Sequence, residues 1–364
     1  MKILIACGGT GGHMAPGIAI AQRLKELGHE ATLAISRKSI DGRMAASYGD
    51  LTFKSIPGSG FSLRPIPLIK FVIGAARGFF TALGLLRRGN YSAAIAFGGF
   101  SALGVGLAAA VLRRPLYLHE ANVKLGKAIR FLAPLAKIVF IPPQLKKRQP
   151  YAQRKKFQAA AYPLRRDFQL IDREDARKKL GLPNFGKLLL ITGGSQGSKV
   201  LSQWMMDNVN SIAALGFHCI SLGGLGQNCS DKFADGARGN TFTVRYLPFS
   251  DSMHLMHSAA DIAICRAGAG TIAELLAATL PNVLVPYPSA AENHQLANAL
   301  AMESEGASKV VEQRNLGMLL EVVAELADGD MCGKMKENLL RMRDCQKNGT
   351  ESLSAAILRD LGIN

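Results

Sequence analysis

Short apolar runs recur along the chain, and several are followed by glycine and then by a helical pattern of apolar positions. The first run, Lys2–Ala6, precedes the stretch CGGTGGH and a helical pattern that ends near Leu27. Further runs follow at 31–36, 93–97, 115–120 and 136–142, with helical patterns between them. This alternation is typical of a parallel sheet with helices on both faces.

A second series of the same kind begins at residue 187. It opens with KLLLIT, the glycine stretch GGSQGS and a helical pattern. It then continues through segments at 217–223, 241–247, 260–276, 282–288 and 308–312. Proline and charged residues interrupt the rhythm at 162–183, which is the predicted linker.

These two series predict an α/β protein with two Rossmann-like, doubly wound domains facing a cleft. A length of 364 residues suits two domains. Their predicted bounds are 1–164 and 165–330, and a helical tail over 331–364 is expected to pack back toward the first domain. Ligands of such domains bind beyond the carboxyl ends of the strands, which is where the glycine turns fall.

Two long apolar stretches raise the question of membrane contact. Residues 91–112 carry no charge, but their four glycines divide them into a buried strand, a turn and a helix. Residues 66–89 are apolar yet contain Lys70 and Arg77 and end near Arg87 and Arg88. A helix at the membrane interface is favoured for 66–89, and a core helix with snorkelling ends is the alternative.

Charge is distributed unevenly between the halves. The net charge of +17 results from +19 over residues 1–164 and −2 over residues 165–364. A basic half attracts nucleic acid, an anionic membrane surface or a polyphosphate ligand. The basic residues are not interleaved with aromatic ones and no recognition motif is present, so nucleic acid is not an expected partner.

The glycine turns do not match a dinucleotide-binding fingerprint. GTGGHM has methionine where GxGxxG needs its last glycine, and the strand after the first helix ends in LAISRKS without an acid for a ribose. Nicotinamide chemistry is therefore disfavoured. Phosphate binding is retained, because such turns expose backbone N–H groups at a helix N-terminus. Tight strand–helix packing is the alternative reading of either turn.

The segment CRAGAGTIAE at 265–274 is more specific. A strand, a flexible turn and a helix bring Arg266 and the amides of Gly268–Thr271 to one point, where a pyrophosphate would find a counter-charge. Glu274, about one turn into the helix, could accept hydrogen bonds from two ribose hydroxyls. It could instead merely complement the helix dipole.

Taken in order, seven segments resemble the MurG family, the bacterial UDP-N-acetylglucosamine transferases that add the second sugar to the peptidoglycan lipid precursor. The resemblance runs from residue 2 to about residue 312 and implies the glycosyltransferase-B fold, with the acceptor held by the first domain and the donor nucleotide by the second. The segments are GGTGGHMAPGIAIAQRL, GGFSALG, HEAN, ITGGSQGS, PFSDSM, CRAGAGTIAE and VPYPSAAENHQLANA.

The same resemblance implies roles for individual residues. His13 is the candidate catalytic residue, and the acceptor set is Gly11, Gly12, Glu120 and Asn122. The donor set is Thr10, Arg165, Ser195, Phe249, Ser250, Met253, Arg266, Gly268, Glu274, His294 and Gln295. Ala267, His294 and the stretch GSGFSLRP at 58–65 depart from the usual family pattern.

His13 is also distinctive without the resemblance. It stands at the mouth of the first helix, directly after the glycines, and an imidazole with a pKa near neutrality can remove the proton of an attacking hydroxyl. The alternative is a histidine that only caps or supports the helix.

The implied activity is an inverting transfer of N-acetylglucosamine from UDP-N-acetylglucosamine to the 4-hydroxyl of undecaprenyl-pyrophosphoryl-N-acetylmuramoyl-pentapeptide. The expected place is the cytoplasmic face of the bacterial cell membrane, as a peripheral protein. No cofactor or metal is expected, because the one DxD triplet, at 328–330, reads as a turn. One alternative is a UDP-sugar transferase with another lipid acceptor. Another is a non-enzymatic basic protein that binds membrane surfaces or nucleic acid, which salt-sensitive nucleic-acid binding without UDP binding would favour.

Overall fold

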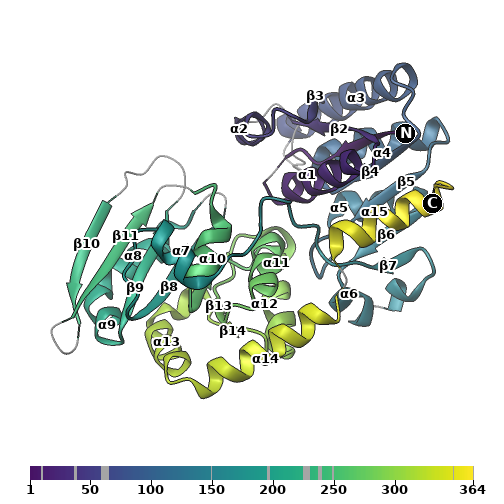
Figure 1. The fold of residues 1–364 in the computed structure, drawn as a ribbon. Coiled ribbons are helices and arrows are strands. Elements are labelled where there is room, and N and C mark those ends of the chain that lie inside the picture. Colours follow the sequence, from purple (N-terminus) through teal and green to yellow (C-terminus); the bar gives the residue numbers. More distant parts are fainter. Residues whose placement is uncertain are drawn as a thin grey trace. The chain divides into compact units, whose positions relative to one another are not determined.

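The chain forms two compact units in the computed structural model (Figure 1). One unit comprises Met1–Arg166 together with Gln346–Asn364, and the other comprises Asp167–Cys345. The expected tail over 331–364 is thus divided between the units, because its first helix belongs to the second unit and its last helix to the first. The structure describes residues 1–9, 11–36, 39–58, 65–148, 150–194, 197–223, 230–236, 240–247, 250–346 and 348–363.

The first unit is built on a seven-stranded sheet in which every pair of neighbouring strands is parallel. The strand order is β3-β2-β1-β4-β5-β6-β7. The strands are β1 (Lys2–Ala6), β2 (Glu30–Ile35), β3 (Thr52–Ser55), β4 (Ala93–Ala96), β5 (Leu116–His119), β6 (Ile138–Ile141) and β7 (Phe157–Ala159).

Helices cover both faces of this sheet. Because successive side chains of a strand point to opposite faces, Ile3 and Ile5 of β1 pack with α1 and α15, whereas Leu4 and Ala6 pack with α3, α4 and α5. The helices of the unit are α1 (Gly11–Glu26), α2 (Ser39–Ala46), α3 (Pro65–Arg88), α4 (Gly99–Val111), α5 (Lys127–Leu132), α6 (Pro143–Arg148) and α15 (Gly349–Asp360).

Glycine brings the first helix close to the first strand. A Cβ on Gly17, in α1, would lie 2.5 Å from the Cβ of Cys7, just after β1. Gly17 therefore allows the close helix–strand packing that the last glycine provides in a dinucleotide-binding fingerprint. A similar approach joins α3 to α4, because a Cβ on Gly104 would lie 2.9 Å from the carbonyl carbon of Gly78.

The second unit repeats this plan with one antiparallel edge strand. Its sheet has the order β10-β11-β9-β8-β12-β13-β14, and only β10 runs antiparallel to its neighbour. The strands are β8 (Lys187–Thr192), β9 (Phe217–Leu222), β10 (Ser230–Asp235), β11 (Thr241–Leu247), β12 (Ile262–Cys265), β13 (Asn282–Leu284) and β14 (Lys309–Val310).

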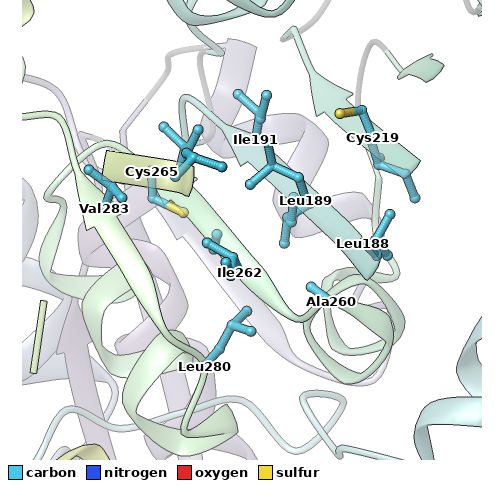
Figure 2. Close-up of a cluster of buried hydrophobic side chains, with 14 of the residues drawn as sticks. Leu188, Leu189, Ile191, Cys219, Ala260, Ile262, Cys265, Leu280 and Val283 are labelled. Atoms are coloured by element: carbon cyan, nitrogen blue, oxygen red, sulfur yellow. The ribbon is translucent and has the colours of Figure 1, made fainter. Parts of the chain in front are cut away.

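The core of the second unit is centred on β8 and β12. Figure 2 shows the buried side chains of Leu189 and Ile191 from β8 and of Ile262 and Cys265 from β12 in this cluster. The helices of the unit are α7 (Arg173–Lys179), α8 (Lys199–Asp207), α9 (Val209–Ala214), α10 (Met253–Ala259), α11 (Ala269–Ala278), α12 (His294–Ser304), α13 (Leu319–Ala327) and α14 (Asp330–Asp344). Short 3-10 turns include η4 (Ala291–Asn293) and η5 (Gln313–Met318).

The structure confirms the two predicted series of strands and helices. Residues 91–112 form β4, a Gly98-Gly99 turn and α4, as predicted. The linker predicted over 162–183 was too long, because α7 forms within it and packs with α10. The strands β3, β7 and β10 were not predicted.

Helix α3 is the one helix among the described residues that is long and apolar enough to cross a membrane, judged by length and composition alone. The candidate window is Ile69–Arg88, and only 17% of it is buried. The face of α3 that carries Ala82 and Leu86 is buried in the first unit.

The Gly17–Cys7 approach predicts the effect of a single methyl group. Gly17→Ala should lower the free energy of unfolding by about 1–3 kcal/mol, because the added Cβ must push α1 away from β1. Gly84→Ala is the matched control, since a Cβ at Gly84 of α3 would meet nothing within 4 Å. That variant should gain up to about 1 kcal/mol from helix propensity. Urea denaturation of both variants measures the difference, and equal effects would contradict the packing argument.

Candidate functional site

In each sheet the strand order reverses at one point, because the first strand has an early strand of the unit on one side and a later strand on the other. In the first unit this point lies between β1 and β4, and in the second it lies between β8 and β12. Loops at the carboxyl ends of such strand pairs diverge to opposite faces and leave room for a ligand. The two pairs of glycine turns singled out in the sequence follow these four strands.

His13 lies at the first of these points. It is in the first turn of α1, and its imidazole lies against the Gly98-Gly99 turn that follows β4. A Cβ on Gly98 would lie 3.0 Å from Nε2 of His13, and one on Gly99 would lie 3.4 Å from Nδ1. Both glycines have positive φ angles, 105° and 73°. The turn therefore needs glycine for its backbone and also for the space that the imidazole occupies.

A buried carboxylate that the sequence reasoning missed holds the first glycine loop. Asp41 is 0% exposed, and its Oδ2 accepts hydrogen bonds from the Gly9 N–H at 2.9 Å and from the Ser36 N–H and hydroxyl at 2.9 and 2.5 Å. The amide of Gly9 thus faces an anion of the chain itself. A signal was present, since residues 1–164 contain only five acidic residues.

His119, the last residue of β5, is buried close to the same point. Its ring lies 5.3 Å from that of Phe97 and 6.2 Å from that of Tyr162, whose hydroxyl donates to the Gly12 carbonyl at 3.2 Å. Burial lowers the pKa of His119 to about 3, a hydrogen bond to the Ala161 backbone opposes this, and the charge of His13 adds to it. His119 therefore stays neutral beside His13.

The two residues expected in the acceptor segment, Glu120 and Asn122, are hydrogen-bonded to each other. Glu120 is buried, and its Oε1 accepts from the backbone and side-chain amides of Asn122, both at 2.9 Å. Its Oε2 accepts from the Gly126 N–H at 2.6 Å, just before α5. Burial raises the pKa of Glu120, and these hydrogen bonds act in the opposite direction. Glu120 therefore shapes the loop that carries Asn122.

A glycine loop also lies at the second point of divergence. Among the described residues, no carboxylate is hydrogen-bonded to this loop. A Cβ on Gly193 would lie 2.1 Å from the carbonyl carbon of Gly197, and Gly194 and Gly197 have φ angles of 75° and 68°. The loop leads into α8, whose N-cap is Ser198. Amides at a helix N-terminus and the positive end of its dipole favour an anion.

Arg266 follows β12 and connects the segments around this point. The side chain is buried, and Nη1 donates to the carbonyls of Val285 and Pro286 at 3.1 and 3.3 Å. Nη2 donates to the Ser198 hydroxyl at 3.0 Å and to Oε1 of Gln313 at 2.6 Å. Burial lowers the pKa of Arg266. The part played by Gln313 was not foreseen in the sequence.

Glu274 and Gly268 lie on the same strand–helix junction. Gly268 is the N-cap of α11, and Glu274 is half-buried in that helix, so both lie within the nine residues that follow β12. On the neighbouring loop, the Ser250 hydroxyl accepts from the Ser252 N–H at 3.0 Å, and Met253 begins α10.

A strained turn precedes His294 and Gln295, the first two residues of α12. Glu292 and Asn293 both have left-handed backbone conformations, with φ angles of 53° and 54°, just before α12. Oε1 of Gln295 accepts from the Tyr287 N–H at 2.9 Å, and the Tyr287 ring lies 5.5 Å from the Arg266 guanidinium. Non-glycine residues in this conformation cost free energy and cluster at ligand sites.

The remaining expected residues are placed as follows. Nη1 of Arg165 donates to the Tyr48 hydroxyl at 2.8 Å, within the first unit. Gly11 and Gly12 begin α1. Thr10, Ser195 and Phe249 lie outside the described residues. In the described part of the chain, no group of three or more His, Cys, Asp or Glu side chains could hold a metal ion.

Two family models match the chain, one over most of the first unit and one over most of the second. Residues 3–141 match the glycosyltransferase family 28 N-terminal domain, and residues 188–353 match the C-terminal domain of the same family. Both points of strand divergence lie within the matched ranges.

Relatives resemble the chain over nearly its whole length. A protein of Opitutus terrae, named UDP-N-acetylglucosamine–N-acetylmuramyl-(pentapeptide) pyrophosphoryl-undecaprenol N-acetylglucosamine transferase, is 40% identical over 93% of this chain and 90% of its own. A protein of the same name from Halothermothrix orenii is 31% identical over 94% of this chain and 95% of its own. Among solved structures, Acinetobacter baumannii MurG has a TM-score of 0.72 and 26% identity over 98% of this chain and 99% of its own.

The buried His119 predicts sensitivity to acid. Its pKa falls from the ordinary 6.5 to about 3 on folding, so between these values the unfolded chain binds a proton that the folded chain does not. Stability should therefore fall by about 1.4 kcal/mol per pH unit below 6.5, or about 2 kcal/mol by pH 5. His119→Gln should remove this part of the acid dependence in urea denaturation. At pH 8, where the imidazole is neutral in both states, the variant should show only its packing loss. An equal gap between variant and wild type at pH 5 and pH 8 would contradict the assignment.

Proposed function

The chain belongs to glycosyltransferase family 28 and, within it, to the MurG family of N-acetylglucosamine transferases, and on this premise we propose the reaction and its residues. The enzyme transfers N-acetylglucosamine from UDP-N-acetylglucosamine to the 4-hydroxyl of lipid-linked N-acetylmuramoyl-pentapeptide, the step that converts lipid I to lipid II in peptidoglycan synthesis. The observation that carries this function is that the likeness to named transferases extends through both units and both points of strand divergence.

The second unit holds the donor. The N-termini of α8 and α11 and the buried guanidinium of Arg266 lie at one point of strand divergence, which suits a diphosphate. Glu274 accepts hydrogen bonds from the ribose hydroxyls. Gln295 reads the sugar through its Nε2 amide, since its Oε1 is committed to the backbone of Tyr287. Ser195, Phe249, Ser250, Met253 and His294 complete this set. The resemblance adds Thr10 and Arg165 to the donor residues, and both belong to the first unit.

The first unit holds the acceptor, and His13 is the base. The 4-hydroxyl oxygen attacks the anomeric carbon and forms the new glycosidic bond as the bond to the UDP oxygen breaks. The hydroxyl proton goes to His13, the electron pair of the broken bond stays on UDP, and the configuration at the anomeric carbon inverts. The charge that develops on UDP is stabilised by the positive environment of the donor site.

The neutral His119 supports this role of His13. A second imidazolium at this point would repel a proton from His13, and burial prevents His119 from becoming one at working pH. The Gly98-Gly99 turn fixes the imidazole ring of His13 from one side. Gly11, Gly12 and Asn122 bind the acceptor, and Glu120 holds the Asn122 loop in place.

Helix α3 attaches the enzyme to the membrane surface. Ile66, Ile69, Ile73 and Phe80 are between 51% and 69% exposed and fall on one side of the helix by their spacing. Exposed basic residues accompany this side: Lys70, Arg77, Arg87 and Arg88. An apolar side with basic residues beside it suits an interfacial helix on anionic lipid, so the attachment is peripheral. The cytoplasmic face is the side of the membrane that the family resemblance implies.

A pair of variants tests the division of labour between the units. His13→Ala should lower kcat by about a hundredfold or more while the Kd for UDP stays the same, because the base belongs to the acceptor unit. Glu274→Ala should weaken UDP binding by about 1.5–3 kcal/mol. Steady-state kinetics with lipid-linked acceptor and calorimetry with UDP measure both effects. Near-normal turnover in His13→Ala would remove it as the base, and an unchanged UDP affinity in Glu274→Ala would remove Glu274 from the donor site.

Neutralising the basic residues of α3 tests the membrane surface. Replacement of Lys70, Arg77, Arg87 and Arg88 by Gln should release the protein from phosphatidylglycerol vesicles at physiological salt, because each charge near the surface contributes about 1 kcal/mol. The control replaces four exposed basic residues elsewhere in the first unit, Arg113, Arg114, Arg154 and Lys155. It removes the same charge and should still co-sediment. Equal release in both variants would mean that binding follows net charge and not α3.

A further inference from the structure

The guanidinium of Arg266 is a buried cation without a buried anion beside it. Its four hydrogen bonds go to two carbonyls, one hydroxyl and one amide, all of them neutral groups. Among the described residues no carboxylate pairs with it, and the only aromatic group over it is the Tyr287 ring. A buried charge left without a counter-charge costs folding free energy.

Two helix N-termini add to this positive charge. Ser198, which accepts a hydrogen bond from Arg266, is the N-cap of α8, and α11 begins three residues after Arg266, at Ala269. Each N-terminus carries a partial positive charge. The guanidinium and both helix N-termini are positive, so a bound anion would neutralise positive charge that the chain itself leaves uncompensated.

Gln313 occupies a position at which a carboxylate side chain would neutralise the charge of Arg266. Its Oε1 lies 2.6 Å from Nη2 of Arg266, and a glutamate has the same shape. The next residue toward the N-terminus, Glu312, is a carboxylate, but it pairs with Arg314 at 2.9 Å. The chain therefore has an amide where a carboxylate would stabilise the unliganded fold.

We propose that Gln313 is a positioning residue that keeps Arg266 uncompensated, so that this buried charge attracts the donor diphosphate through space. Both terminal nitrogens of Arg266 are committed to the chain, which is why the attraction acts without displacing its hydrogen bonds. The inference rests on the proposed donor site and adds to it the source of its charge selectivity.

Gln313→Glu tests the proposal, with UDP, UMP and uridine as probes in calorimetry. The new carboxylate keeps the hydrogen bond and neutralises the cation, so the Kd should rise by about tenfold or more for UDP and less for UMP. For uridine it should change by less than about twofold. The melting temperature without ligand should stay the same or rise, and the increase that UDP causes should shrink. Asn210→Asp, which adds the same charge on the exposed side of α9, should leave all three affinities as they are.

Gln313→Met separates the charge from the hydrogen bond. It removes the bond without adding charge, so any loss should be equal for the three probes. An equal loss for UDP and uridine in Gln313→Glu, or no loss for UDP, would overturn the proposal while leaving the donor site intact. A wild-type protein that does not bind UDP would overturn the donor site as well. If Gln313→Glu does not fold, Arg266→Gln removes the same charge from the other side and should show the same graded loss.

Discussion

Both units depend on the reversal of strand order beside their first strand. Because β4 is added on the side of β1 away from β2, and β12 on the side of β8 away from β9, the loops after these strands diverge. The chain places opposite buried charges at these two points: the carboxylate of Asp41 in the first unit and the guanidinium of Arg266 in the second. The proposed acceptor and donor sites thus share one architecture and differ in the buried group that lies beside the diverging loops.

Much of the fold could be predicted from the sequence, because its strands are buried on both faces and so appear as continuous apolar runs. Lys2–Ala6 and Thr241–Leu247 were predicted with their observed bounds. Three of the four edge strands, β3, β7 and β10, were not predicted. Of these, β3 and β10 contain polar residues, as TFKS and SDKFAD, because an edge strand is partly exposed. Helix α7 was assigned to the linker because its segment REDARKK is highly charged. The helix begins at an N-cap, Asp172, whose side chain accepts hydrogen bonds from the amides of Glu174 and Asp175.

The positions of the candidate site residues could be predicted where these residues lie in contiguous motifs. His13, Arg266 and Glu274 stand next to glycine turns, and their place in the fold follows from the strand that precedes each turn. Asp41 and Gln313 could not be found this way, because the groups that they contact lie 32 and 47 residues away in the chain. Glu120 was predicted as an acceptor residue. Its hydrogen bond with the Gly126 amide, which holds the loop, could not be predicted from the spacing of residues in the sequence. Only the folded chain brings such partners together.

The last helix of the chain, α15, has a consequence for the order of synthesis. Its Leu353 and Ile357 are fully buried in the same cluster as Ile3 and Ile5, so one face of the first sheet is completed by residues that are made only after the second unit. All of Asp167–Cys345 must be translated in between, which takes about 10–35 s at ordinary rates of elongation. During that interval the emerging first unit exposes an apolar face to the chaperones around it. The first unit therefore begins to form before the second unit and is completed only after it.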